Sequence, residues 1–225
     1  MREIDGMRRA VAERAAALVQ PGMKVGLGTG RTAALVVRAI AARTKEIVGV
    51  ATSEATAALA RELGVPLASL DEVRRLDLCI DGADEFDPAL DLIKGLGGAL
   101  LREKLVAEAA ERFVVIVDEQ KRVARLGEKA PLPVEVVPFG VTHTREKLAA
   151  LGLAPTLRTD GTQPVRTDGG NVILDCRWTT SIDARTLAAQ VKATTGVVEH
   201  GFFLGMADTV LVGTPSGVEE LRRPR

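Results

Sequence analysis

Short apolar segments alternate with amphipathic segments over the first half of the chain, and this alternation constrains the fold more than any other feature. Strands are predicted at 24–28, 47–51, 66–70, 76–80 and 113–117. Helices are predicted at 8–20, 32–44, 53–63 and 99–110. Strands that alternate with helices form a mostly parallel sheet flanked by helices. The sequence therefore predicts an α/β fold with a Rossmann-like sheet.

The pattern changes near Gly127, where turn residues replace the long helices. Strands are predicted at 165–167, 171–176 and 196–203, and a helix at 184–194. We therefore expect a small α+β, ferredoxin-like domain at 128–203. The apolar segment 208–213 is expected to return to the main sheet, so that 1–127 and 204–225 form one discontinuous domain.

The charge balance and the termini indicate which partners are expected. Thirty basic and thirty acidic residues cancel, so bulk charge does not favour nucleic acid or a membrane surface. The charged N-terminus has no signal-peptide core, and no apolar run approaches the roughly 18 residues that span a bilayer. We expect a cytoplasmic protein. Cys79 and Cys176 are expected to be buried thiols, and neither histidine is spaced from them like a metal ligand.

A glycine-rich loop, Gly26-Leu27-Gly28-Thr29-Gly30-Arg31-Thr32, links the first strand to a helix. A dinucleotide site is disfavoured because arginine stands where the third glycine belongs and no acidic residue ends the second strand. A P-loop is disfavoured because Gly-Lys-Ser/Thr is missing. A phosphate cradle or a plain turn remains, and for Ser53 helix capping is favoured over ligand contact.

A second loop, Asp81-Gly82-Ala83-Asp84-Glu85, places three carboxylates where a buried strand should end. The carboxyl edge of an open α/β sheet is where ligands bind. Lys94-Gly95-Leu96-Gly97-Gly98 follows, and then Glu103 about one turn into a helix. The acidic loop is a metal-binding cluster, a proton-transfer site balanced by Lys94, or a solvated turn. Glu103 is either an ordinary surface residue or the base that removes a proton next to a carbonyl.

Together these segments resemble the ribose-5-phosphate isomerase A family. The resemblance runs in the same order over nearly the whole chain, through 28–32, 81–85, 94–104, 131–136, 168–171, 196–203 and 213–215. It implies that 128–203 is a lid domain. It also implies an isomerase of the pentose phosphate pathway that interconverts ribose 5-phosphate and ribulose 5-phosphate through an enediolate, without metal or cofactor.

The resemblance also implies roles for individual residues. Glu103 would be the base, Asp81 and Lys94 would manage protons and charge on the sugar oxygens, and Asp84 would assist ring opening or bind a hydroxyl. The phosphate end would be held by Thr29, Gly30, Arg31, Thr32 and Lys121. The rest of the substrate-binding set would be Gly82, Ala83, Gly95, Leu96 and Gly97.

Two positions depart from the family pattern. Arg31 stands where the family usually has serine, and Leu96 interrupts a loop that is usually all glycine. Arg31 either strengthens phosphate binding or points to solvent. A homodimer, or a tetramer, is expected from the resemblance alone.

Two other functions compete with the isomerase. A sugar-phosphate sensor usually carries an attached DNA-binding domain, and only about 22 residues precede the first predicted strand. A CoA-transferase-like enzyme would use a glutamate as nucleophile and is expected to be longer or to have a partner subunit.

Overall fold

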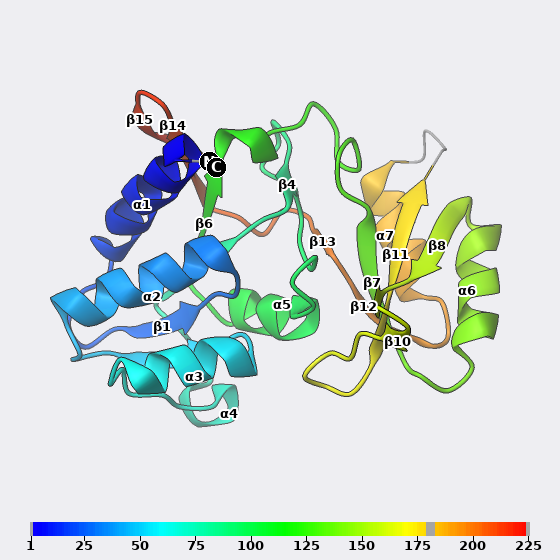
Figure 1. Cartoon of the computed structure of the whole chain (residues 1–225), viewed down its shortest axis with the longest axis horizontal. Coiled ribbons are helices and arrows are strands. Elements are labelled where there is room, and N and C mark those ends of the chain that lie inside the picture. Colours follow the sequence, from blue (N-terminus) through cyan, green and yellow to red (C-terminus); the bar gives the residue numbers. More distant parts are fainter. Residues whose placement is uncertain (1, 179–182, 224–225) are drawn as a thin grey trace. The chain divides into compact units, whose positions relative to one another are not determined.

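The computed structural model describes residues 2–178 and 183–223. The described chain forms two compact units (Figure 1). The first comprises 2–83, 102–122 and 205–223, and the second comprises 84–101 and 123–204 apart from the gap at 179–182. Each unit has its own sheet and its own hydrophobic core.

The first unit is built on a sheet in the order β15-β14-β6-β3-β1-β2. Its strands are β1 (Lys24–Leu27), β2 (Val48–Ala51), β3 (Leu78–Gly82), β6 (Phe113–Asp118), β14 (Thr209–Thr214) and β15 (Gly217–Arg222). All neighbouring pairs are parallel except β14 with β15. The chain moves outward from β1 to β2 and then crosses to β3 on the other side, so β1 and β3 flank a topological switch point.

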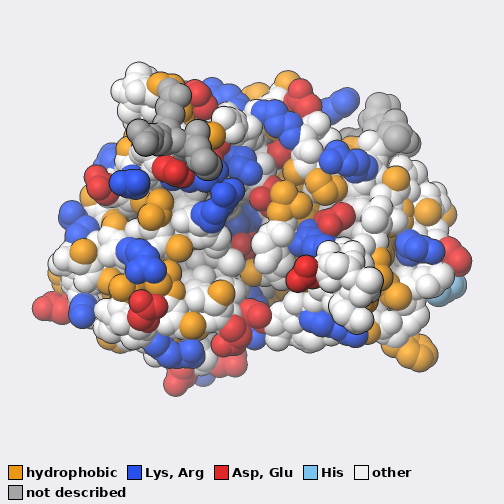
Figure 2. All heavy atoms as spheres, viewed as in Figure 1, with side chains coloured by type: hydrophobic (Ala, Val, Ile, Leu, Met, Phe, Trp, Pro, Cys, Tyr) orange, Lys and Arg blue, Asp and Glu red, His pale blue; other side chains and the backbone are white. Residues whose placement is uncertain are grey.

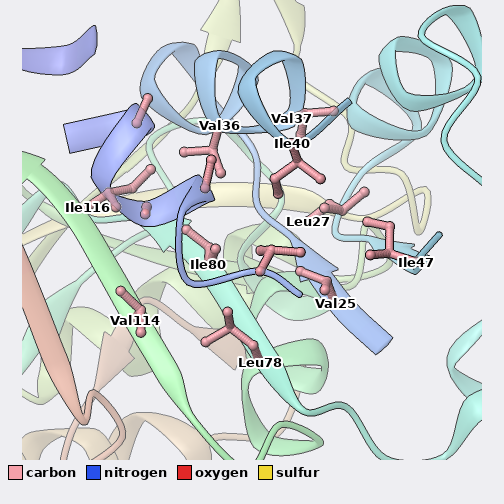
Figure 3. Close-up of a cluster of buried hydrophobic side chains, with 14 of the residues drawn as sticks. Val25, Leu27, Val36, Val37, Ile40, Ile47, Leu78, Ile80, Val114 and Ile116 are labelled. Carbon is pink, nitrogen blue, oxygen red and sulfur yellow. The ribbon is translucent and has the colours of Figure 1, made fainter. Parts of the chain in front are cut away.

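Helices cover both faces of this sheet. They are α1 (Arg2–Ala16), α2 (Arg31–Arg43), α3 (Glu54–Glu62) and α5 (Leu100–Glu108). A further short helix, α4 (Leu70–Val73), buries none of its own residues. Figure 3 shows Val36 and Ile40 of α2 packed with Leu27 and Ile80 of the sheet. A methyl group on Gly26 would instead stand 2.6 Å from Val106 of α5. Because neighbouring strand residues point to opposite faces, α5 lies on the face opposite α2.

The second unit contains a sheet in the order β12-β7-β11-β8. Its elements in chain order are β7 (Leu132–Val136), α6 (Val141–Ala150), β8 (Leu153–Leu157), β11 (Val172–Trp178), α7 (Ala184–Lys192) and β12 (Val197–His200). All three strand pairs are antiparallel. The βαββαβ order of elements is ferredoxin-like, as predicted.

One face of this second sheet packs against helices. Val134 and Leu174 share a buried cluster with Leu148 of α6 and Leu187 of α7. Since side chains alternate along a strand, Pro133, Glu135, Ile173 and Asp175 point to the opposite face. Two smaller sheets complete the unit: β4 (Glu85–Phe86), β5 (Leu92–Ile93) and β13 (Phe202–Phe203), and the pair β9 (Thr159–Asp160) and β10 (Gln163–Pro164).

Several predicted elements differ from the structure. The strand predicted at 66–70 is wrong, because only Leu67 forms a bridge, to Gly49, and α4 begins at Leu70. The strand at 165–167 is likewise reduced to one bridge, Arg166 to Val172. The first helix begins and ends earlier than predicted, and the strand at 196–203 is split into β12 and β13. The return of 208–213 to the main sheet is confirmed by β14.

The domain boundaries predicted at 127/128 and 203/204 stay a prediction, because compact units do not show which segments fold together. The compact units place 84–101 with the second unit instead. Ile93 from this segment lies in the second core, and Glu85 accepts hydrogen bonds from backbone amides at 127–130.

The two cysteines are buried, as predicted. Burial raises the pKa of the Cys176 thiol to about 12, so this thiol is protonated and unreactive at neutral pH.

Acidic and basic side chains are interspersed on the face shown in Figure 2. Within the described ranges, no helix combines the length and the apolar character needed to cross a membrane.

Candidate active site

Asp81 is a buried carboxylate of the first unit that two backbone amides hold in place. It is fully buried near the end of β3, and its Oδ1 accepts hydrogen bonds from the backbone N–H of Thr29 at 3.0 Å and of Gly82 at 2.7 Å. A Cβ on Gly28 would collide with this carboxylate, which explains the glycine there. The first glycine-rich loop and the acidic loop therefore meet at the switch point between β1 and β3.

A cluster of hydroxyl groups holds the side chain of Thr29. Its Oγ1 lies 2.7 Å from Thr52 Oγ1, donates to Ser53 Oγ at 2.8 Å and lies 3.2 Å from Thr56 Oγ1. Thr52 and Thr56 in turn donate to the backbone oxygens of Leu27 and Gly28. Ser53 also caps α3 by accepting from the N–H of Thr56 at 3.1 Å, which confirms the predicted cap.

The first glycine-rich loop ends at the N-terminus of α2. Gly30 is the N-cap residue, with φ 110°, and has no side chain with which to cap the helix. The first-turn amides, including those of Arg31 and Thr32, therefore point toward a position suited to an anion. Arg31 is exposed and Thr32 half-buried. Lys121 ends a short 3₁₀ helix, η1 (Glu119–Lys121), which follows β6 at the same carboxyl edge of the sheet. By strand spacing, β6 lies about 10 Å from β1, with β3 between them.

Glu103 lies in α5 and is only 5% exposed. The alternative of an ordinary surface residue is therefore wrong. The next residue, Lys104, is also buried, whereas Leu105 is 47% exposed. Charged side chains are seldom buried without polar surroundings, so the burial of Glu103 and Lys104 beside an exposed leucine indicates a polar site at this part of α5.

The second glycine-rich loop belongs to the second unit. Lys94 is 2% exposed, its N–H donates to the oxygen of Gly201 at 2.9 Å, and its Nζ lies 5.4 Å from the centroid of the Phe203 ring. Asp84 accepts from the N–H of Leu96 at 2.9 Å. Gly95 has φ 106°, and a Cβ there would stand 2.8 Å from Leu100. Asp84 and the loop that follows Lys94 are thus brought together.

Glu85 differs from the two aspartates beside it. Its buried carboxylate accepts from the amides of Gly127 at 2.6 Å and of Lys129 and Ala130 at 2.5 Å. These bonds give Glu85 a structural role, in tying the 127–130 segment to β4. Among residues 2–178 and 183–223, no group of three or more His, Cys, Asp or Glu is arranged to hold a metal ion.

The predicted site residues thus fall into two sets. In the first unit, Asp81 is joined to Thr29, and Lys121 lies farther along the same sheet edge. In the second unit, Asp84 is joined to the loop that follows Lys94. The sequence patterns assign no site role to Phe203 or Arg158, because neither stands beside a charged or glycine-rich motif of the site.

Comparisons with known proteins point to one family. The model of the ribose 5-phosphate isomerase A (phosphoriboisomerase A) family matches residues 48–217. The chain is similar to ribose-5-phosphate isomerase A of Roseiflexus castenholzii, at 55% identity over 96% of this chain and 95% of that protein. It is also similar to the Deinococcus radiodurans protein of the same name, at 49% identity over 98% and 100%.

Solved structures of proteins with the same function in their names are also similar to this chain. Ribose 5-phosphate isomerase A from Methanocaldococcus jannaschii has a TM-score of 0.92 and 42% identity, covering 97% of this chain and 99% of that one. A D-ribose-5-phosphate isomerase in complex with phospho-erythronic acid has a TM-score of 0.94 and 39% identity, covering 98% and 99%.

Proposed function

The chain belongs to the ribose-5-phosphate isomerase A family, and on this premise we propose that it interconverts D-ribose 5-phosphate and D-ribulose 5-phosphate with Glu103 as the base. Family membership makes the chain an isomerase of this sugar phosphate pair. The observation that carries the assignment of the base is the burial of Glu103 in a helix that exposes its apolar neighbour Leu105.

The proposed reaction moves one proton between two carbons. The Glu103 carboxylate removes the proton from C2 of the open-chain aldose, and the C–H electron pair forms the C1=C2 bond of an enediolate while charge develops on O1. A proton passes from O2 to O1. The protonated Glu103 then returns its proton to C1, which leaves the carbonyl at C2.

Charge stabilisation must lower the barrier, because a carboxylate is a much weaker base than an enolate. We assign this task to Lys94, whose ammonium group is almost completely buried and therefore acts with little screening by water. Asp81, anchored by two backbone amides, would exchange protons with the sugar oxygens. Asp84 would bind a hydroxyl or assist ring opening.

The phosphate end of the substrate is assigned to the N-terminus of α2. Gly30, Arg31 and Thr32 offer backbone amides there, and Arg31 and Lys121 supply positive charge on the same sheet edge. The N–H and hydroxyl of Thr29 are already engaged with Asp81 and the hydroxyl cluster. We therefore propose that Thr29 contributes by positioning the loop.

The decisive test follows ketose formation from ribose 5-phosphate and from unphosphorylated ribose, with EDTA present throughout. Conversion of only the phosphorylated sugar is expected. Glu103→Gln keeps the side-chain shape but removes the base, so kcat should fall by at least about 100-fold with KM changed by less than about threefold. Glu108→Gln, on the exposed side of the same helix, is the matched control and should retain wild-type turnover.

Three outcomes would contradict parts of this proposal. Normal turnover in Glu103→Gln would exclude Glu103 as the base. Loss of activity in EDTA, restored by a divalent cation, would overturn the proposal of a metal-free reaction. Saturable binding of ribose 5-phosphate without conversion by the wild type would identify a sugar-phosphate sensor.

The wider setting rests on the family resemblance. We propose a cytoplasmic enzyme that works as a homodimer or a tetramer of this chain. Sedimentation equilibrium measures the mass in solution, and a monomer at assay concentration would contradict the proposed assembly.

A further inference from the structure

Arg158, which follows β8 in the second unit, forms a two-pronged pair with Asp175 of β11. Its Nε donates to Asp175 Oδ2 at 2.8 Å and its Nη2 donates to Oδ1 at 2.5 Å. The arginine and aspartate side chains are 14% and 23% exposed. Two parallel N–H···O bonds fix the plane of the guanidinium group. Asp175 therefore determines where the remaining nitrogen of Arg158 points.

That remaining nitrogen reaches the second glycine-rich loop. Arg158 Nη1 donates to the backbone oxygens of Gly95 and Leu96, each at 3.0 Å. The loop also lies close to the second sheet. A Cβ atom built on Gly95 would lie 3.3 Å from Pro133, and one built on Gly98 would lie 3.7 Å from Ile173. Both Pro133 and Ile173 point from the face of the second sheet opposite α6 and α7. The loop thus lies on the same face as Asp175.

One peptide group is held at both ends by this arrangement. The oxygen of Gly95 accepts from Arg158, while the N–H of the same peptide, that of Leu96, donates to Asp84. This peptide group joins the first and second residues after Lys94, whose own N–H donates to the oxygen of Gly201. Such support is needed because glycines at 95, 97 and 98 give the loop backbone many alternative conformations.

We propose that Arg158, oriented by Asp175, is a positioning residue that holds the loop 94–98 in the conformation in which Lys94 and Asp84 act on the substrate. The proposal rests on the proposed isomerase function for its kinetic consequences. Nε, Nη1 and Nη2 of Arg158 each donate to another group of the protein, so Arg158 acts through the loop. An ammonium group stabilises an enediolate only while it is held at the right place, and a displacement of about 1 Å can cost about 100-fold in rate. Lysine could not replace this fork of donors.

The first test compares Arg158→Met with Arg177→Met. Arg177 lies two residues from Asp175 on β11, is exposed, and donates to the oxygen of Lys129 at 3.5 Å rather than to the oxygens of Gly95 and Leu96. For Arg158→Met, kcat should fall at least about tenfold while KM stays within about threefold, because phosphate binding is retained. Arg177→Met should match the wild type.

Phospho-erythronic acid, the acid bound in one of the solved relatives, supplies a second readout. Its carboxylate resembles the charge of the enediolate, so its affinity reports the positioning of Lys94. Its Kd in Arg158→Met should rise as much as kcat falls. A purely structural arginine would lower the melting temperature and leave kcat and this Kd unchanged at a temperature well below melting, and that result would overturn the proposal.

If Arg158→Met fails to fold, Asp175→Asn tests the same inference. Asparagine keeps the shape of the aspartate side chain but removes the negative charge that orients Arg158. Hydrogen exchange at the amides of Leu96 and Gly98 should speed up in this variant, and kcat should fall. Wild-type exchange and turnover would overturn the proposal. Exchange does not require activity, so it still decides the role of Arg158 if the wild type proves not to be an isomerase.

Discussion

At the residue scale, the Gly28 backbone approaches the Asp81 carboxylate so closely that no side chain fits between them. A methyl group on Gly28 would overlap that carboxylate, so Gly28→Ala must displace Asp81 or move β1. We expect a loss of about 1–3 kcal/mol in the free energy of unfolding, together with a lower kcat. Gly6→Ala is the matched control, because Gly6 lies inside α1 with open space around its Cα and should gain about 0.5–1 kcal/mol. Thermal denaturation measures the stability change in both variants. An unchanged kcat in Gly28→Ala would show that activity does not require Asp81 to keep this position.

At the scale of elements, the N-cap of α3 serves both the helix and the phosphate loop. Ser53→Ala removes the cap and one partner of Thr29, so it should cost about 1 kcal/mol and raise KM for ribose 5-phosphate. Ser69→Ala removes a comparable cap from α4, whose capping box with Glu72 lies away from the loop. Its KM should match the wild type. An equal effect of both substitutions on KM would argue against any role of the Ser53 hydroxyl in the phosphate site.

The elements also show which parts of the molecule the sequence could predict. Most strands of the parallel sheet were predicted because they are continuous apolar runs. Helix α6 was missed because only Thr144 and Leu148 are buried in it, too few for a clear helical period. Strand β8 was missed because Pro155 interrupts it, which is tolerated since β8 is an edge strand.

The candidate site also has parts that the sequence marks and parts that it does not. Glu103 and the two glycine-rich loops stand out in the sequence because charged residues and glycines follow one another in short motifs, and their roles stay predictions. The clamp of Arg158 on Asp175 joins residues 17 apart across two strands, and no local pattern marks such a pair.

At the scale of the whole molecule, the two cores can be loosened separately. Leu174→Ala in the second core and Ile116→Ala in the first should each cost about 2–5 kcal/mol, because both side chains are almost completely buried. In hydrogen exchange, segment 84–101 should respond to Leu174→Ala, since Ile93 shares that core. A response of 84–101 to Ile116→Ala alone would instead support the boundary predicted from the sequence at 127/128.

The position of β14 between β6 and β15 has a consequence for the order of events during synthesis. Residues 209–214 leave the ribosome only after every segment of the second unit has been translated. Until then β6 lacks one of its two neighbours, and its N–H and C=O groups on that side have no strand to pair with. The second unit can therefore complete its sheet first, while the sheet that carries Asp81 waits with an open edge that a chaperone or another nascent chain can reach.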